Sequence, residues 1–391
     1  MEHKLLMIPG PVEFDPEVNA AVGEATVSHV APDFIESFGR SLELMRKVWE
    51  APGGQPFILA GSGTLAMDTA ACNLIEPGDH ALVLSTGYFG ERYAELLTRY
   101  GARVEVLRSE PGYSIDIGIV EAELKKHDYK LLTFTHVDTS TAVRVDPEPL
   151  GRLGREYNVL TILDGVCSVA AEEIYQQEWG IDVVLTASQK AIGVPPGLAL
   201  LVVSERAMNT WRGRKTKVAN YYADWTNWLP IMEAYEDRRA SYFGTPAVNL
   251  VKGLDISLQQ ILAEGNAVRF ARHKLVADSF RAGLEALNIK QIPVSTALAA
   301  NTLSAPYYPE GISGAELIAA INNSGVVVAG GLHPDLKSKY FRVGHMGSVS
   351  EYDHILDTIG AIEKALAQLG YNFTEGSGRE ATYKMLNNGS S

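Results

Sequence analysis

The chain has 391 residues, enough to bury a large core and to form roughly two or three folding units. Its 34 basic and 47 acidic residues give a net charge of −13 and form no basic run, which argues against nucleic acid and anionic membranes as partners. The only cysteines, Cys72 and Cys167, fit neither a disulfide framework nor a zinc pattern, so no metal site and a reducing compartment are expected.

Targeting signals are not evident. In residues 1–30 a Pro-Gly-Pro sequence interrupts any apolar region, and Lys4 is the only Lys or Arg, which argues against secretory and transit peptides. No stretch approaches the ~18 uncharged apolar residues of a membrane span. The C-terminal residues 386–391 are not a peroxisomal signal. We therefore expect a cytoplasmic protein.

Residues 1–16 form an N-terminal arm punctuated by Pro and Gly, and Asp33–Trp49 has the apolar spacing of a helix. Beyond it, short apolar runs alternate with helical patterns, which predicts an α/β fold with a mostly parallel sheet. Too few residues separate the last two runs for a helical crossover, so the final strand is expected to be antiparallel. The predicted strands are Phe57–Leu59, Ala81–Ser85, Val104–Leu107, Leu131–Thr135, Val159–Asp164, Val183–Ala187 and Leu198–Val203.

The second half of the chain changes character. Residues 211–246 gather aromatic side chains without a strand or helix period, and a long helical pattern follows Pro246. Shorter elements and a closing helix near Tyr352–Leu369 predict a smaller C-terminal α+β domain. The expected units are the arm (1–16), a large domain (17–264) and a small domain (265–391). The polar residues from about Gly370 are expected to fray.

Two charged residues lie at strand ends. Asp164 ends one apolar run, and Lys190 follows the next run along the chain. A pyridoxal phosphate (PLP) enzyme needs this pair: the lysine amine forms a Schiff base with the cofactor, and the carboxylate keeps the pyridine nitrogen protonated. A helix-capping acid and a snorkelling lysine are the structural alternatives. The pair is favoured because strand carboxyl ends meet at the ligand-binding edge of such sheets.

Gly61-Ser-Gly-Thr64 is a third feature at a strand end. It lies between the strand Phe57–Leu59 and a helical run, where free amides and two hydroxyls suit a phosphate. Taken alone, an ordinary glycine turn with a threonine cap explains it as well. Together with Asp164 and Lys190 it predicts one cofactor site.

The chain resembles the class V aminotransferases of PLP fold type I, in the alanine–glyoxylate and serine–pyruvate group. The Ser-Gln-Lys segment with its upstream Asp is the specific part of this resemblance, which covers nearly the whole length. It implies PLP as cofactor, a mostly parallel seven-stranded sheet, and a homodimer with shared active sites. The matching segments are Ile8–Pro11, Ala60–Thr64, Thr135–Thr141, Leu163–Ser168, Thr186–Gly193, Pro195–Leu198, Ala329–Leu332 and Phe341–Gly344.

The resemblance also implies roles for single residues. Lys190 would be the Schiff-base lysine, and Asp164 the partner of the pyridine nitrogen. Arg342 would clamp the substrate α-carboxylate, with a structural ion pair as the alternative, and Gly10 would lie in an arm over the site. The remaining residues would contact the cofactor: Ser62, Gly63, Thr64 and Gln189 near the phosphate, Thr139 by hydrogen bonding, Phe89 by stacking in place of a tryptophan, and Tyr242 and Thr245 from the neighbouring subunit.

His136 and His345 are expected to be core or supporting residues, because Lys190 already supplies the proton transfer.

The predicted reaction is PLP-dependent transamination of a small amino acid (alanine, or serine) to a small 2-oxo acid (glyoxylate, or pyruvate), preferably alanine to glyoxylate. Serine–pyruvate and serine–glyoxylate transamination are the alternatives. A cysteine desulfurase-like lyase is disfavoured because Gln189 replaces a histidine and both cysteines lie in apolar settings. A non-catalytic regulator is disfavoured because no basic domain is appended. No second arginine for a distal carboxylate is evident, although the sequence does not place Arg40, Arg92 and Arg144.

Overall fold

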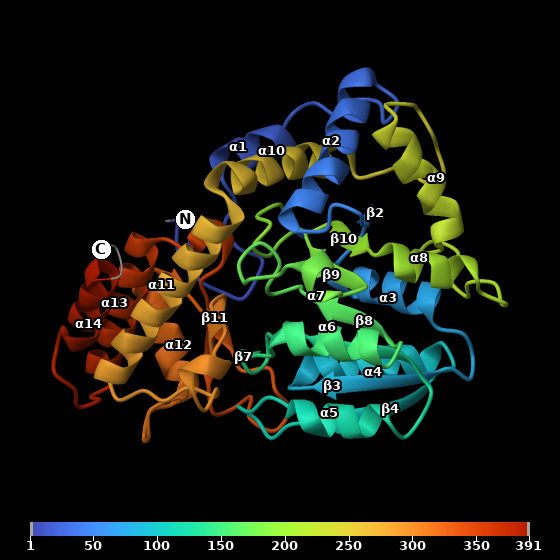
Figure 1. The fold of residues 1–391 in the computed structure, drawn as a ribbon. Helices are drawn as coiled ribbons and strands as arrows, with labels where there is room; N and C mark the ends of the chain where they lie inside the picture. Colours follow the sequence, from blue (N-terminus) through green and yellow to red (C-terminus); the bar gives the residue numbers. More distant parts are fainter. Residues whose placement is uncertain (1–2, 389–391) are drawn as a thin grey trace.

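The computed structural model describes residues 3–388. A seven-stranded sheet of order β2-β10-β9-β8-β5-β3-β4 forms its centre (Figure 1). Neighbours from β9 to β4 are parallel, and β10 is antiparallel to both β9 and β2, as the sequence predicts. The strands are β2 (Gln55–Ala60), β3 (His80–Ser85), β4 (Arg103–Arg108), β5 (Tyr129–Thr135), β8 (Leu160–Asp164), β9 (Val183–Ala187) and β10 (Leu198–Val203).

Helices pack against this sheet. α3 (Gly63–Leu74) contacts β9 and β10, α4 (Tyr88–Arg99) contacts β3 and β4, and α6 (Pro147–Glu156) contacts β8. All residues of β8, β9 and β10 are buried, as expected for mostly apolar strands that are covered on both faces, and Thr161, Asp164 and Thr186 are the only polar residues among them. The loops at the carboxyl ends of the strands are therefore held on a rigid layer.

The remaining helices of the first 264 residues pack around this layer. α9 contradicts the prediction that residues 211–246 lack a helical period. Trp225, Trp228 and Tyr235 share its buried face, and the Asp224 side chain caps it by accepting from the Thr226 amide. The surrounding aromatic residues and Pro230 obscured this spacing. The helices are α1 (Pro16–Val22), α2 (Pro32–Val48), α5 (Ile117–Leu124), α7 (Gln176–Trp179), α8 (Glu205–Arg212), α9 (Trp225–Glu236) and α10 (Val248–Glu264).

The C-terminal part combines helices with short strands, and β14 pairs with both β11 and β13. The prediction of frayed residues after Gly370 was wrong for α14, which packs on α11 and buries Thr382 and Leu386. Small residues on its contact face give a weak sequence pattern. The elements are α11 (Asn266–Ala286), η1 (Thr296–Leu298), β11 (Leu303–Ser304), α12 (Gly314–Asn323), β12 (Val326–Val327), β13 (Ala329–Gly330), β14 (Phe341–Gly344), η2 (Gly347–Val349), α13 (Tyr352–Gln368) and α14 (Ser377–Asn388).

The N-terminal arm is tied to both parts of the chain. Its strand β1 (Leu5–Leu6) pairs in parallel with β12, and the Gly344 amide donates to the Met7 carbonyl at 2.9 Å. Further along, the Val12 amide donates to the Gln189 carbonyl at 3.1 Å. The arm therefore runs from the C-terminal elements to the residue beside Lys190.

Two hydrophobic cores lie side by side. The first surrounds the central sheet and extends from Val18 to Ile261. The second is built mainly by α11–α14 and the strands between them, and it also includes Cys167 and Ala191. Asp164 and Lys190 are close to these two residues in sequence, so they lie where the two cores meet. A short hairpin near this junction is formed by β6 (Val137–Asp138) and β7 (Val143–Arg144).

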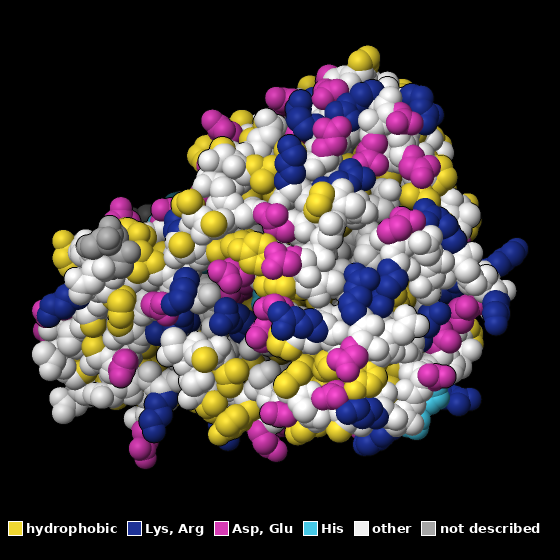
Figure 2. Space-filling model, in the orientation of Figure 1, with side chains coloured by type: hydrophobic (Ala, Val, Ile, Leu, Met, Phe, Trp, Pro, Cys, Tyr) yellow, Lys and Arg dark blue, Asp and Glu magenta, His cyan; other side chains and the backbone are white. Residues whose placement is uncertain are grey.

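On the face shown in Figure 2, Lys and Arg side chains are interspersed with Asp and Glu. Within residues 3–388, no helix is both long and apolar enough to cross a membrane. The C-terminal residues 389–391, where a peroxisomal signal was sought, lie outside the described residues.

Candidate active site

A cavity of about 180 Å³ lies at the carboxyl edge of the central sheet. Because β2, β3, β5, β8 and β9 run in the same direction, the segments that follow them converge at this edge. Met67, Thr135 and Val166 add to its lining. The predicted site residues that line it are Ser62, Gly63, Thr64, Phe89, Thr139, Asp164, Gln189 and Lys190.

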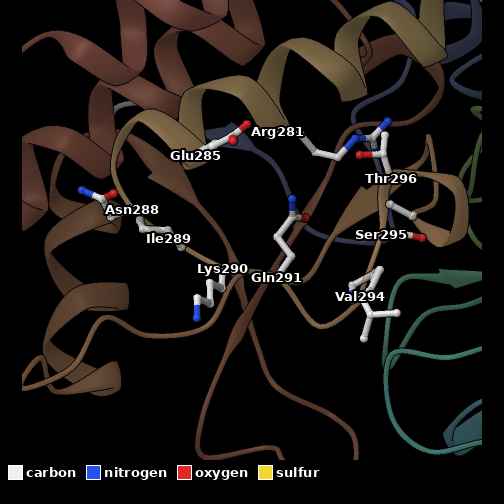
Figure 3. A pocket seen from close by; sticks show the side chains of 11 residues that line it. Arg281, Glu285, Asn288, Ile289, Lys290, Gln291, Val294, Ser295 and Thr296 are labelled. Carbon is white, nitrogen blue, oxygen red and sulfur yellow. The ribbon is translucent and has the colours of Figure 1, made fainter.

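A larger cavity of about 460 Å³ lies elsewhere, in the C-terminal part of the chain (Figure 3). Arg281 and Glu285 reach it from α11, and Ser295 and Thr296 reach it from the segment that follows. Arg281 is already engaged, since it donates to the Asp278 carboxylate at 2.7 Å. No predicted site residue lines this cavity, so the convergence of strand ends, and not volume, identifies the candidate active site.

Lys190 is enclosed by the N-terminal arm. Its side chain is 9% exposed, its Nζ donates to the Pro9 carbonyl, and Cys167 Sγ lies 3.5 Å from the same Nζ. Gly10 has a φ of 98°, a conformation that L residues rarely adopt, and a Cβ placed there would lie 2.8 Å from Lys190 Nζ. The arm thus covers the amine with backbone atoms alone.

Asp164 is a buried carboxylate without a basic partner. It is 2% exposed, it accepts a hydrogen bond of 3.1 Å from the Val166 amide, and no Lys, Arg or His within residues 3–388 lies within ion-pair distance. Burial raises the pKa of Asp164 to about 6 and nearby Asp138 reinforces the rise, whereas the Val166 hydrogen bond and the more distant charges of Lys190 and Arg92 oppose it. A protonated ring nitrogen would supply the missing positive partner.

The start of α3 offers unpaired donors. The first amides of a helix have no intrahelical acceptor, and the N-cap residue Ser62 makes no side-chain capping bond. Gln189 Oε1, together with Thr135 Oγ1, is buried without a hydrogen-bond partner within the described chain. Unpaired amides at a helix N-terminus suit a phosphate, and orphaned buried polar atoms are costly unless a ligand satisfies them. The residues present therefore fit PLP.

Asp138 is a structural residue that sequence analysis missed. It is fully buried, and its carboxylate accepts hydrogen bonds from the amides of Phe89 at 3.0 Å and Ser140 at 2.8 Å. Ser140 Oγ accepts from the Tyr88 amide at 3.0 Å. α4 has no side-chain cap of its own, because Gly87 occupies its N-cap position. The loop after β5 therefore caps α4 and fixes the backbone that carries Phe89.

Arg342 approaches the cavity from β14 through Thr139. Its Nη1 donates to the Thr139 carbonyl at 3.3 Å, and its Nε donates to the Gly330 carbonyl at 2.8 Å. Burial lowers the pKa of Arg342 from its usual value. No carboxylate in residues 3–388 forms an ion pair with it, which excludes the structural ion pair as its role there. Its charge therefore lacks a partner close to the cofactor cavity.

The aminotransferase class-V family model matches residues 12–346. The chain belongs to the class-V aminotransferases. Alanine–glyoxylate aminotransferase 1 of Saccharomyces cerevisiae is 38% identical, over 88% of this chain and 91% of the relative. L-aspartate–glyoxylate aminotransferase of Paracoccus denitrificans is 31% identical, over 95% of this chain and 93% of the relative. The crystal structure of an alanine–glyoxylate aminotransferase from Nostoc sp. has a TM-score of 0.88 and 31% identity, and covers 94% of this chain and 96% of that chain.

This class-V aminotransferase is a PLP-dependent enzyme of the predicted α/β fold. Its other predicted site residues lie outside the cavity lining. Tyr242 is 65% exposed and its ring lies 5.4 Å from that of His29, and Thr245 is exposed as well. Burial lowers the pKa of His136 and of His345 to about 3, so both are neutral at ordinary pH.

Proposed function

We propose that this aminotransferase transfers the amino group of a small amino acid, alanine or serine, to a small 2-oxo acid, glyoxylate or pyruvate. Alanine and glyoxylate are the preferred pair, in keeping with the alanine–glyoxylate aminotransferases of yeast and Nostoc that this chain resembles. The observation that carries the proposal is that Lys190 and Asp164 line one cavity, while Arg342 donates a hydrogen bond to the carbonyl of Thr139 in the lining of the same cavity.

The placement of the arginines supports a small substrate. Arg40 is paired with Asp255, and Arg144 lies 3.4 Å from Glu172. Arg92 contacts Thr64, at the cofactor side of the cavity. Of the arginines considered, Arg342 is therefore the one at the substrate side without a carboxylate partner, which suits a substrate with a single carboxylate.

In this reaction each residue in or beside the cavity has a separate role. PLP, when bound, supplies an electron-accepting ring. Lys190 Nζ holds the cofactor and then moves the proton of the substrate Cα, while Asp164 holds a proton at the ring nitrogen. Arg342 binds the α-carboxylate with its planar fork. The arm at Gly10 excludes water. Ser62, Gly63, Thr64 and Gln189 hold the phosphate, Thr139 contributes its hydroxyl, and Phe89 stacks on the ring.

We propose a homodimer in which Tyr242 and Thr245 reach the phosphate bound by the partner subunit. Both residues are exposed and neither lines the cavity of its own chain, and Tyr221 in the same aromatic segment is 81% exposed. Mixing a Lys190→Ala chain with a Tyr242→Ala/Thr245→Ala chain tests this arrangement. A shared site predicts that mixed dimers regain one intact site, with PLP binding and activity. An active monomer, or no recovery on mixing, contradicts it.

We also propose that the arm (1–16), the large domain (17–264) and the small domain (265–391) are separate units. The second hydrophobic core, which α11–α14 dominate, supports this division. Limited proteolysis tests it, since cleavage is expected near residue 265 before it occurs inside either core. Earlier cleavage within the central sheet would contradict the division.

A half-reaction measurement tests the substrate proposal. The PLP-loaded enzyme is mixed with single amino acids, and the cofactor absorbance is followed as PLP converts to pyridoxamine phosphate. We expect alanine to convert it rapidly, serine to convert it at a comparable or lower rate, and glyoxylate to reverse the change. Faster conversion by L-aspartate would contradict a small donor. No conversion by any amino acid would contradict transamination itself.

A further inference from the structure

Arg92 is a cationic residue without an acidic partner at the edge of the cofactor cavity. It lies on α4, three residues after Phe89, and its Nη2 donates to Thr64 Oγ1 at 3.2 Å. Its guanidinium carbon lies 5.8 Å from the Phe89 ring centroid and 5.9 Å from that of Tyr88. No Asp or Glu in residues 3–388 forms an ion pair with it, whereas Arg99 on the same helix pairs with Glu95.

Among residues 3–388, the proposed phosphate site otherwise lacks positive side chains. Lys190 is the only cationic residue that lines the cavity, and its Nζ is directed to the Pro9 carbonyl and to Cys167. The remaining donors at the start of α3 are uncharged amides and the hydroxyls of Ser62 and Thr64. A phosphate monoester carries a charge of about −1.5 to −2 at pH 7, and a helix N-terminus offsets only about half a unit charge.

We propose that Arg92 is the cationic partner of the cofactor phosphate and that it positions the Thr64 hydroxyl for that phosphate. The inference rests on the proposed function of this site. Because Thr64 Oγ1 accepts from Arg92, the hydroxyl proton is free to point to a phosphate oxygen. A charged donor also polarises the hydroxyl and strengthens the bond that it donates. The rings of Tyr88 and Phe89 hold the guanidinium in place through cation–π contacts.

A distal substrate carboxylate is the competing ligand for Arg92. The geometry favours the phosphate, because the two arginines contact different residues of the cavity lining. Arg92 donates to the Thr64 hydroxyl, whereas Arg342 donates to the Thr139 carbonyl. Thr64 begins the helix whose free amides form the phosphate turn. Arg92 and Arg342 therefore serve different parts of the cavity.

The test compares PLP with pyridoxal, which keeps the aldehyde and the ring but lacks the phosphate. Absorbance titrations give the affinity of both compounds for the wild type, Arg92→Gln and Arg92→Lys. Arg99→Gln is the matched control, because it removes the same charge from the same helix, and because Arg92 and Arg99 both line a second small cavity that also touches Thr64. We expect Arg92→Gln to weaken PLP binding about 10- to 100-fold and pyridoxal binding less than about threefold. Arg92→Lys should recover part of the loss, and Arg99→Gln should change neither affinity.

A second measurement follows the coupling between the two residues. If Arg92 acts through Thr64, the loss of PLP affinity in Arg92→Gln/Thr64→Val is smaller than the product of the two single losses. If Arg92→Gln does not fold, as judged by circular dichroism, Arg92→Lys provides the same comparison of PLP with pyridoxal. A variant that folds normally and loses affinity for one ligand only cannot be explained by a general structural role.

Several outcomes would overturn the inference. Equal losses for PLP and pyridoxal would make Arg92 structural. Unchanged PLP affinity with a raised KM for L-aspartate alone would assign Arg92 to a substrate carboxylate. A wild-type protein that binds neither compound would contradict the proposed function of the site, and the inference would fail with it. PLP binding by the wild type and by Arg92→Gln with equal affinity would contradict the inference alone.

Discussion

The carboxylate of Asp138 accepts a hydrogen bond of 3.0 Å from the backbone amide of Phe89, which lies 49 residues earlier in the chain. We expect Asp138→Ala to lower the free energy of unfolding by about 1–3 kcal/mol, because buried amides at the start of α4 lose their acceptor. PLP affinity should fall as well, because Phe89 is no longer fixed. Asp116→Ala is the control, since it removes an exposed cap of α5 and should leave PLP affinity unchanged. Asp138→Ala with normal PLP affinity would show that the cap does not position Phe89.

Lys190→Ala should bind PLP only non-covalently. Its complex should therefore lack the absorbance band of the covalently held cofactor and should lose PLP on gel filtration. The reason is that Lys190 supplies the only amine among the residues lining the cavity. Absorbance and retained PLP are measured before and after filtration. Lys290→Ala, at the distant cavity of Figure 3, should behave as the wild type. An unchanged band in Lys190→Ala would place the cofactor elsewhere.

Asp164 should make the stability of the cofactor-free enzyme depend on pH. Burial raises its pKa from 3.8 to about 6 in the folded protein, so the ionised form opposes folding. The free energy of unfolding should therefore fall as pH rises from about 4 to 6, by an amount on the order of 3 kcal/mol from this residue. Asp164→Asn should remove the contribution of this residue to the decrease in the free energy of unfolding.

The measurement is denaturant unfolding of cofactor-free wild type and Asp164→Asn across this pH range. Because burial also raises the pKa of Asp138 and Glu172, the difference between the two proteins is the quantity to compare. Asp146→Asn, at an exposed helix cap, serves as control. If the free energy of unfolding changes with pH in the same way in wild type and Asp164→Asn, the raised pKa of Asp164 is refuted. With PLP bound, Asp164→Asn should retain the fold and transaminate far more slowly.

Arg342→Ala should raise the KM for the amino-acid donor about 30- to 150-fold, because a charged hydrogen-bonding partner of the α-carboxylate is lost. PLP affinity should change little. Steady-state kinetics and PLP titration provide the two measurements, and Arg342→Lys should fall between wild type and Ala because it keeps the charge without the fork. If Arg342→Ala loses donor and PLP binding equally, the residue supports the structure and does not bind substrate.

The central sheet and the Lys190–Asp164 pair were predictable because both produce local signals. Buried strands are continuous apolar runs, and a charged residue directly after such a run is conspicuous. The short separation before β10 likewise fixed its antiparallel direction. These features depend on residues that are neighbours in the sequence.

The parts that sequence analysis missed depend on distant pairs. Asp138 caps a helix that begins 50 residues before it. Arg92 is distinguished by having no acidic partner among the described residues 3–388, which only the structure reveals. β1 has only two residues, and it is a strand only because it pairs with β12. The buried residues of α14 include the small residues Gly378 and Thr382, which carry little hydrophobic signal. Tertiary packing decides each of these features.

The pairing of β1 with β12 also bears on the timing of folding during synthesis. Leu5 and Leu6 leave the ribosome early, but their partners Val326 and Val327 follow only after more than three hundred further residues. At about 5–20 residues per second the arm waits roughly 15–65 seconds before it can pair. The strand pairing that ties the arm to the C-terminal elements therefore cannot form until most of the chain has been synthesised.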